Sequence, residues 1–288
     1  LVMMPVDMGG CPVGCLGIPE FGTDLVIQMV VDTKPNTISD LIRISGLSHG
    51  TDVWLNNAQE LIRSGKATIS TAICTRDDIM TYLINKGMDS EESFTIMERV
   101  RKGTVAKGKC KEWPEFKKDM AEHNVPDWYV WSCEQIKYMF PKAHAAAYVM
   151  MAYRIAYCKS NYPLAYYGAY FGIRADAFSY EIMCQGKEKL QYYIDDYNRR
   201  SATLSKKEQD TMKDMKIVQE MYARGFEFEP LDIYKAQATK YLIVNGKLMP
   251  PLSSIDGMGE KAAEAVAEPS KDGTYLSLDD FRQRTKAS

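Results

Sequence analysis

A helical period in the apolar residues covers most of the chain and restricts the folds that it can adopt. Apolar side chains recur at three- and four-residue spacing, which is typical of amphipathic helices. Pro126, Pro141 and Pro163 stand at expected helix ends, and Gly65 and Gly87 follow two periodic segments as C-terminal glycines do. We therefore predict a mainly α-helical body. Its helices are expected from residue 24 onward and over residues 37–45, 52–63, 77–86, 89–101, 115–124, 127–139, 142–161 and 204–225.

The pattern changes after Gly225. Residues 226–229 alternate with period two, and Asn245-Gly246 stands between two short apolar runs, which predicts a two-residue β-hairpin. An Ile-x-Gly-Met-Gly sequence and an alanine-rich segment follow. We expect a helix-hairpin-helix here, in which Gly257 and Gly259 present backbone N–H groups to a DNA phosphate and Lys261 adds a positive charge. An ordinary glycine turn between two helices is the alternative.

Composition and charge exclude several classes of protein. The 288 residues carry a net charge of −2, and 45% hydrophobic with 11% aromatic residues is enough for a core, which excludes a disordered chain. No apolar run reaches 18 residues, and the first ten residues lack the basic start of a signal peptide. The seven scattered cysteines are typical of reduced thiols in a cytoplasmic protein, and a metal half-site at Cys11 and Cys15 lacks a second pair of ligands.

A serine-rich segment, Ser45-Gly-Leu-Ser-His-Gly-Thr-Asp52, could carry chemistry. It matches the Gly-x-Ser-x-Gly nucleophile elbow of an α/β-hydrolase, but that motif needs a preceding buried strand and the residues before it have helical period. We favour a glycine-flanked loop between helices, whose backbone N–H groups, two hydroxyls and His49 suit a phosphate-bearing ligand. A polar interhelical turn is the alternative.

A second segment, Pro141-Lys-Ala-His-Ala-Ala-Ala-Tyr148, predicts the start of a helix that carries Lys142, His144 and Tyr148. Its three consecutive alanines leave space for a flat base or for another backbone. The alternative is that His144 and Tyr148 pack inside a tight helical bundle.

The charged residues favour binding over catalysis. No aspartate forms an Asp-x-Asp pair, and we find no set of carboxylates that could converge on two metal ions, so we predict neither catalytic nor metal-binding residues in this chain. Between Arg99 and Lys118, eight basic residues stand against two acidic ones, a local net charge of +6. Arg101 and Lys102 lie in this stretch, which could face DNA or could be a solvated surface.

Several strings together resemble one family, from about Gly17 to the end of the chain. They are Ile18-Pro-Glu-Phe-Gly-Thr23, Ile44-Ser-Gly-Leu-Ser-His-Gly-Thr-Asp-Val-Trp54, Asn57-Ala-Gln-Glu60, Cys74-Thr-Arg-Asp-Asp-Ile-Met80 and Tyr138-Met-Phe-Pro-Lys-Ala-His-Ala-Ala-Ala-Tyr148. They are similar to the C-terminal part of the PolC-type DNA polymerase III alpha subunit, a bacterial replicative polymerase. The resemblance implies a poorly matched lead-in at residues 1–16, a fingers domain at 17–175, a helical connector at 176–225, and the β element with the helix-hairpin-helix at 226–288.

The resemblance also implies the ligands. Fingers of this family close over the incoming deoxynucleoside triphosphate and help to position the primer-template DNA. The residues implied for nucleotide binding are Ser45, Gly46, Ser48, His49, Thr51, Asn57, Arg76, Lys142, His144 and Tyr148. The catalytic aspartates and their Mg²⁺ belong to a palm domain outside this chain, and contacts with the sliding clamp and replisome also belong to other parts. We therefore expect a fragment that is inactive alone. The alternative is a free-standing helix-hairpin-helix DNA-binding protein.

Overall fold

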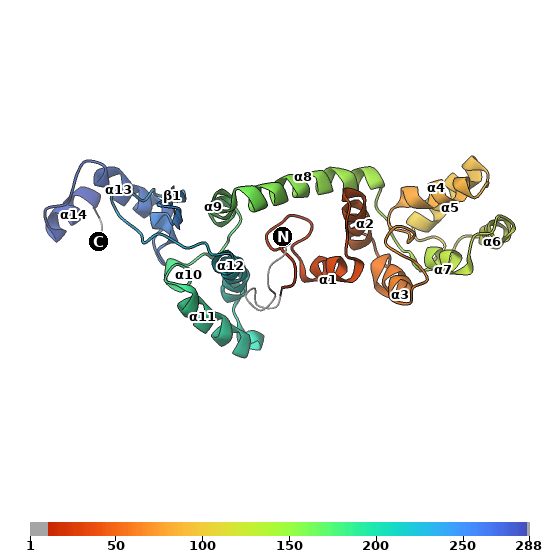
Figure 1. The fold of residues 1–288 in the computed structure, drawn as a ribbon, viewed down its shortest axis with the longest axis horizontal. Coiled ribbons are helices and arrows are strands. Elements are labelled where there is room, and N and C mark those ends of the chain that lie inside the picture. Colours follow the sequence, from red (N-terminus) through yellow and green to blue (C-terminus); the bar gives the residue numbers. More distant parts are fainter. Residues whose placement is uncertain (1–10, 287–288) are drawn as a thin grey trace. The chain divides into compact units, whose positions relative to one another are not determined.

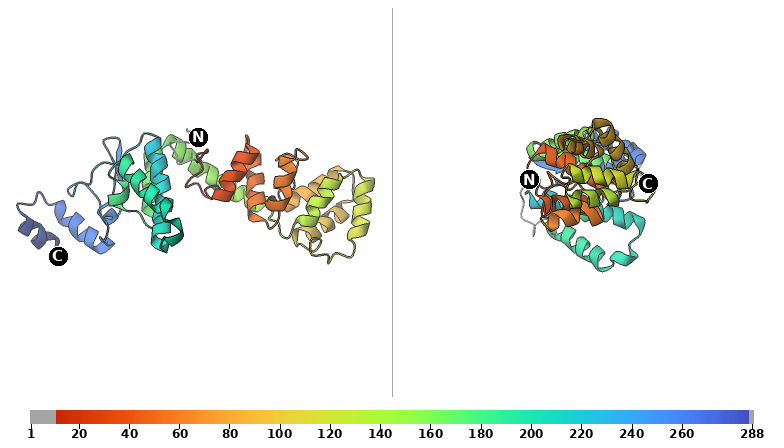
Figure 2. Two further views of the ribbon diagram at one scale, coloured as in Figure 1. Left: turned by 90° about the horizontal axis from the view of Figure 1, so that it is seen from below. Right: turned by 90° about the vertical axis from the view of Figure 1, so that its right-hand side faces the viewer.

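The computed structural model describes residues 11–286, which form two compact units. We call residues 18–154 the N-terminal unit, and the described residues 11–17 and 155–286 the C-terminal unit. Figure 1 labels the elements and Figure 2 gives two further views. The expected mainly helical fold, with one small β element before a C-terminal pair of helices, is confirmed. The lead-in predicted for residues 1–16 lies largely outside the described residues.

Eight α-helices and one π-helical turn lie wholly or partly in the described N-terminal unit. They are α1 (Asp24–Thr33), α2 (Ile38–His49), the π-helical turn η2 (Trp54–Ala58), α3 (Gln59–Arg63), α4 (Arg76–Asn85), α5 (Ser90–Arg101), α6 (Trp113–Glu122), α7 (Asp127–Gln135) and the first part of α8 (Lys142–Asn161). Local caps explain several starts: the Asp40 carboxylate accepts the backbone N–H of Thr37, and the Asp89 carboxylate accepts those of Glu91 and Glu92. Buried aliphatic side chains such as Ile79, Leu83 and Ile96 join α4 to α5 in the core.

Two predicted helices of this unit are shorter than expected. The prediction of one helix over residues 52–63 is wrong, because Leu55, Asn56 and Asn57 have non-helical backbone angles and only residues 59–63 form an α-helix. The helix predicted over 127–139 ends at Gln135, because Tyr138 pairs with Thr51 in an isolated antiparallel bridge. In the second place a backbone contact with a distant segment overrides the local helical pattern, and in the first the Asn57 side chain bonds to the distant Ser132.

The C-terminal unit holds the remaining elements. They are the end of α8, α9 (Pro163–Ile173), α10 (Tyr180–Met183), α11 (Lys187–Arg199), the 3₁₀ turn η3 (Ser201–Thr203), α12 (Lys206–Ala223), β1 (Leu242–Val244), β2 (Lys247–Met249), the 3₁₀ turn η4 (Leu252–Ser254), α13 (Glu260–Ser270) and α14 (Leu278–Thr285). Aromatic rings join α9 to the β element: the Phe171 centroid lies 5.9 Å from that of Phe228 and 6.0 Å from that of Tyr241. A second cluster, which includes Met249, Leu252, Ala263 and Val266, packs α13 against the β element and η4.

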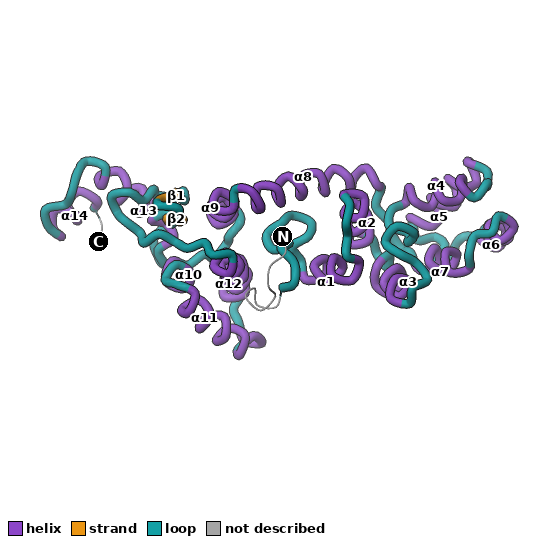
Figure 3. Tube along the Cα trace, viewed as in Figure 1, coloured by secondary structure: helices purple, strands orange, loops and turns teal. Residues whose placement is uncertain are grey.

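The predicted hairpin is confirmed. β1 and β2 pair antiparallel, with Leu242 opposite Met249 and Val244 opposite Lys247, and Figure 3 shows them as the short strands of the unit. Asn245 and Gly246 both have positive φ, 54° and 72°, as a primed turn requires. Glu227 and Glu229, from the segment with period two, bond through their backbones to Leu248.

A buried ion pair holds the start of the described chain in the C-terminal unit. Lys159 Nζ and Glu220 Oε1 lie 2.6 Å apart, and both side chains are fully buried. The same ammonium donates to the carbonyls of Gly14 and Leu16, while the Tyr167 hydroxyl donates to Glu220. Burial lowers the pKa of Lys159, and the Glu220 carboxylate opposes that effect.

The predicted boundary at residue 175 does not coincide with the division into units, which falls at residues 154 and 155. Residues 155–175 lie between the two boundaries. They form the end of α8, all of α9 and the turn after it. These elements belong to the C-terminal unit because Tyr167 and Phe171 of α9 contact Glu220 of α12 and Phe228.

Candidate functional site

The expected phosphate-binding loop at residues 45–52 is wrong in its first half, because Ser45–His49 form the last turns of α2. Gly46 lies within this helix, at its contact with Cys74. It is buried, and a Cβ at this position would lie 2.6 Å from the carbonyl oxygen of Cys74, so only glycine allows the approach. Since Ser48 lies inside α2 and no strand precedes it among residues 11–47, the hydrolase interpretation is also wrong. The Ser48 hydroxyl donates back to the Ser45 carbonyl, 3.0 Å away.

His49 is fixed at the C-terminal end of α2. Its Nδ1 lies 2.7 Å from the Ser45 carbonyl oxygen and its Nε2 lies 2.8 Å from Glu20 Oε2. These two contacts, one at each ring nitrogen, fix the orientation of the imidazole. Glu20, which has a left-handed φ of 70°, was not predicted as a site residue, and no periodicity or spacing singled it out.

His49, His144 and Tyr148, three of the residues proposed for nucleotide binding, lie together. The ring centroids of His49 and His144 are 6.4 Å apart, and those of His144 and Tyr148 are 4.7 Å apart. Phe140 completes the group, 5.6 Å from His49 and 5.1 Å from His144. We call these four residues the aromatic cluster. It joins the end of α2 to the start of α8, and its Tyr148 ring is exposed.

The segment after α2 is fixed by a backbone hydrogen bond, an ion pair and the side chain of Asn57. The Thr51 N–H donates to the Tyr138 carbonyl at 2.9 Å, and Asp52 pairs with Lys137 at 2.6 Å. Asn57 is fully buried: its amide donates to the carbonyls of Asp52 and Ser132 and accepts the Ser132 hydroxyl at 2.5 Å. Thr51 is exposed, whereas the buried Asn57 side chain stabilises the segment through hydrogen bonds in the interior.

Two predicted cations stand at helix starts next to the aromatic cluster. Arg76 opens α4 and its N–H donates to the Phe140 carbonyl, while the N–H of Lys142, which opens α8, donates to Asp77 at 2.7 Å. Within residues 11–286, neither side chain forms an ion pair. Lys142 and Arg43, a residue that was not predicted, line a pocket of about 280 Å³ together with Asp77 and Asp78, whose carboxylates accept backbone N–H groups. This corner of the N-terminal unit therefore presents free positive charge beside flat rings.

The basic stretch is largely neutralised by neighbouring acids. Glu98, just before the stretch, pairs with Arg101 at 2.5 Å and with Lys102 at 2.9 Å. The guanidinium of Arg101 lowers the pKa of Glu98 to about 2. Arg99 pairs with Glu112 at 2.9 Å. Among the described residues, the cations of the stretch without an ion pair are those in the loop after α5, Lys107, Lys109 and Lys111.

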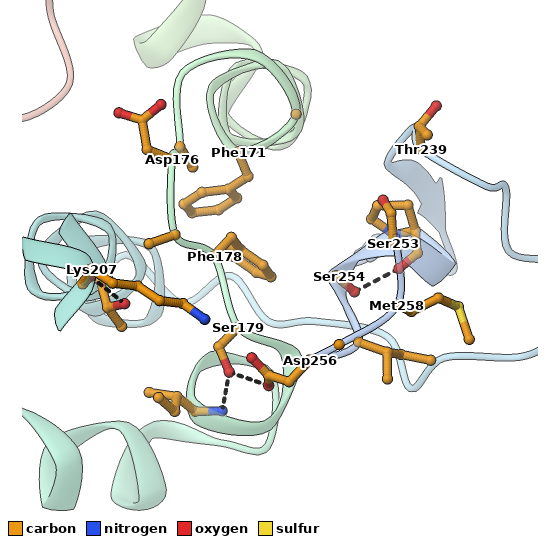
Figure 4. A pocket seen from close by; sticks show the side chains of 18 of the residues that line it. Phe171, Asp176, Phe178, Ser179, Lys207, Thr239, Ser253, Ser254, Asp256 and Met258 are labelled. Carbon is orange, nitrogen blue, oxygen red and sulfur yellow. Dashed lines mark hydrogen bonds between the residues drawn. The ribbon is translucent and has the colours of Figure 1, made fainter. Parts of the chain in front are cut away.

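The predicted hairpin of the helix-hairpin-helix is open to solvent. Gly257 has a φ of 85°, Gly259 caps α13, and a Cβ at either glycine would meet no atom within 4 Å. No side chain caps the first turn of α13, so its N–H groups face outward, with Lys261 exposed beside them. One wall of a pocket of about 720 Å³ is formed by this hairpin (Figure 4). The backbone and charge arrangement suit a phosphate group.

The described residues contain no group of three or more His, Cys, Asp or Glu side chains that could hold a metal ion. All seven cysteines are free. None of the helices within residues 11–286 has the length and hydropathy needed to cross a membrane.

Two family models match the chain. Residues 11–124 match the bacterial DNA polymerase III alpha subunit finger domain, and residues 225–288 match the helix-hairpin-helix motif. The aromatic cluster thus lies partly inside the finger match and partly beyond its end.

Relatives named DNA polymerase III PolC-type match almost the whole chain. Those from Caldanaerobacter subterraneus, Clostridium perfringens and Bacillus subtilis are 51%, 50% and 49% identical over 279 residues. Each match covers 97% of this chain and 20%, 19% and 19% of the respective relative. The chain therefore spans about a fifth of the length of these curated relatives.

Proposed function

This chain belongs to the PolC-type DNA polymerase III family, and we propose that it supplies the fingers and the helix-hairpin-helix DNA contact of a bacterial replicative DNA polymerase. The observation that carries the nucleotide role is the aromatic cluster with the free cations Arg76 and Lys142 beside it. A triphosphate needs positive charge, and a base or base pair needs a flat apolar surface. This corner of the N-terminal unit offers both.

The proposed mechanism is positioning. Arg76 and Lys142 hold the triphosphate, and the exposed ring of Tyr148 contacts the base. His49, oriented by Glu20 and the Ser45 carbonyl, keeps its ring against His144 and Phe140. Such placement can provide much of the rate enhancement in phosphoryl transfer. Ser45, Gly46 and Asn57 support the site from the interior, while Ser48 and Thr51 lie nearer to the surface.

Divalent metal ions would supply stabilisation of negative charge to this chemistry in the whole enzyme. The described residues hold no carboxylate group suited to them. We therefore assign Mg²⁺ to another part of the whole protein. We likewise assign clamp and replisome contacts to other parts, and expect the enzyme in the cytoplasm with the chromosome.

A free-standing helix-hairpin-helix DNA-binding protein remains the alternative. It would share the open hairpin at Gly257 and Gly259, but it gives no reason for the finger-domain match over residues 11–124. The nucleotide site distinguishes the two functions, because only the polymerase would bind a deoxynucleoside triphosphate there.

The test is kinetic and uses a whole polymerase. In the Bacillus subtilis relative, this chain replaces the segment that it matches, and Arg76→Ala or His49→Ala is introduced. Loss of a charged contact, about 1.5–3 kcal/mol, should lower kcat/KM for the nucleotide by roughly 10- to 100-fold while primer-template affinity changes little. Arg63→Ala is the matched control, because Arg63 forms a surface ion pair with Asp32. Normal nucleotide kinetics with collapsed DNA affinity would overturn the assignment.

A further inference from the structure

The pocket beside the hairpin has a second wall with no assigned role. Residues 255–260 form one side, and the opposite side consists of residues 175–179, after α9, and the start of α12 (Figure 4). Lys207 is the lysine that lines this pocket. In Figure 4 its side chain extends from α12 into the pocket, toward Ser179 and Asp256.

Lys207 differs from its neighbours in having no ion pair. Lys206 lies 3.0 Å from Asp210, and Lys213 lies 3.1 Å from the same carboxylate. Within residues 11–286, Lys207 has no carboxylate within ion-pair distance. Its charge is therefore free to interact with a ligand in the pocket.

Two carboxylates around Lys207 are already engaged. Glu208 pairs with Arg200 at 2.7 Å and accepts the N–H of Ser205 at 2.8 Å. Asp256, on the hairpin itself, accepts the hydroxyl of the buried Ser179 at 2.6 Å. Two more acidic residues line the pocket: Asp176, which lies at another end of it in Figure 4, and Glu260, the first residue of α13.

Asp256 poses a problem for phosphate binding, because it directly precedes Gly257 and carries negative charge next to the hairpin N–H groups. Like charges at short range repel, and an opposite charge nearby offsets that repulsion. The Ser179 hydrogen bond holds the Asp256 carboxylate against the opposite wall, and Lys207 reaches toward the same place.

We infer that Lys207 is a positioning residue for DNA, a second cation that reaches the phosphate at the Gly257–Gly259 hairpin from the opposite wall of the pocket and offsets Asp256. The inference rests on the proposed DNA contact of the hairpin. The ligand is a phosphate of the sugar–phosphate backbone, so the contact carries no base sequence information.

The experiment is a salt titration of duplex DNA binding by the 288-residue chain, with four variants checked for native circular dichroism. Lys207→Ala should weaken binding at low salt several-fold and reduce the slope of log K against log salt by about 0.9, the value for one phosphate contact. Lys207→Arg should keep the slope. Lys206→Ala is the matched control, since the adjacent Lys206 is paired with Asp210, and its slope should equal that of the wild type.

Gly259→Val separates failure of this inference from failure of the DNA contact itself. If Gly259→Val weakens binding while Lys207→Ala behaves as Lys206→Ala does, the hairpin binds DNA and the role of Lys207 is refuted. If neither variant changes affinity or slope, the hairpin contact fails and the inference fails with it. A reduced slope in Lys207→Ala alone among the lysine-to-alanine variants supports the inference.

Discussion

At the scale of single residues, Asp214 shows how burial is linked to pH. Its carboxylate is almost fully buried on α12 and accepts the N–H of Ala177 at 2.9 Å. Burial is the main cause that raises the pKa of Asp214 to about 6; the nearby Asp176 and Asp210 act in the same direction, and the hydrogen bond from Ala177 opposes them. An unfolded aspartate has a pKa of about 3.9, so the native state binds more protons between about pH 4 and pH 6. The contribution of Asp214 to stability is therefore lost as the pH rises through this window.

Asp214→Asn replaces the carboxylate by a neutral amide, which removes the pH-dependent loss of stability. The amide oxygen can still accept the N–H of Ala177. We expect the variant to be more stable than the wild type at pH 7.5 by about 1–2 kcal/mol and to lose this advantage by about pH 4. Urea unfolding across this pH range measures the difference. Asp210→Asn is the control with the opposite sign, because Lys206 and Lys213 lower the pKa of Asp210. Equal pH dependence in wild type and Asp214→Asn would contradict the assignment.

Single residues also show what the sequence could not reveal. His49, His144 and Tyr148 could be predicted from their motifs, whereas Glu20 and Phe140 needed the fold, because only tertiary packing brings them to His49. The net positive charge around Arg101 and Lys102 was overestimated, because Glu98 was not counted with the basic stretch. Their partner Glu98 stands just outside the counted stretch but one helical turn away on α5.

At the scale of elements, helix limits followed local signals where those signals were strong. Pro141 fixes the start of α8, and Asp78, whose carboxylate accepts the N–H of Thr75, fixes the start of α4. The predicted helix limits were wrong where a contact with a distant segment determines the end of the helix. α7 ends early because Tyr138 pairs with Thr51, and α2 extends to His49, with Gly46 packed against the Cys74 carbonyl.

The contact of α2 with Cys74 can be tested by Gly46→Ala. A Cβ there would lie 2.6 Å from a backbone oxygen that cannot move aside freely, so we expect a loss of about 1–3 kcal/mol in the free energy of unfolding. Gly172→Ala, in α9, is the matched control, because its Cβ would meet only ordinary contacts at 3.6 Å and alanine favours a helix. Urea unfolding of both variants gives the comparison. If Gly46→Ala is as stable as Gly172→Ala, the close approach is not a constraint.

At the scale of the whole molecule, the sequence predicted the order of parts but not their limits. The helical body, the hairpin at Asn245-Gly246 and the two C-terminal helices follow from periodicity and turn residues. The division at residues 154 and 155 could not be predicted, because it depends on contacts between distant segments. Lys159, for example, is buried against the carbonyls of Gly14 and Leu16.

Primer extension by the Bacillus subtilis relative that carries this chain in place of its matching segment tests the central claim most directly. We predict template-directed extension with Mg²⁺ and all four nucleotides, and none by the 288-residue chain alone, in which no carboxylate set for two metal ions was found. A chimera that folds and binds primer-template but adds no nucleotide would contradict the claim. So would extension by the chain alone, once contaminating polymerase has been excluded.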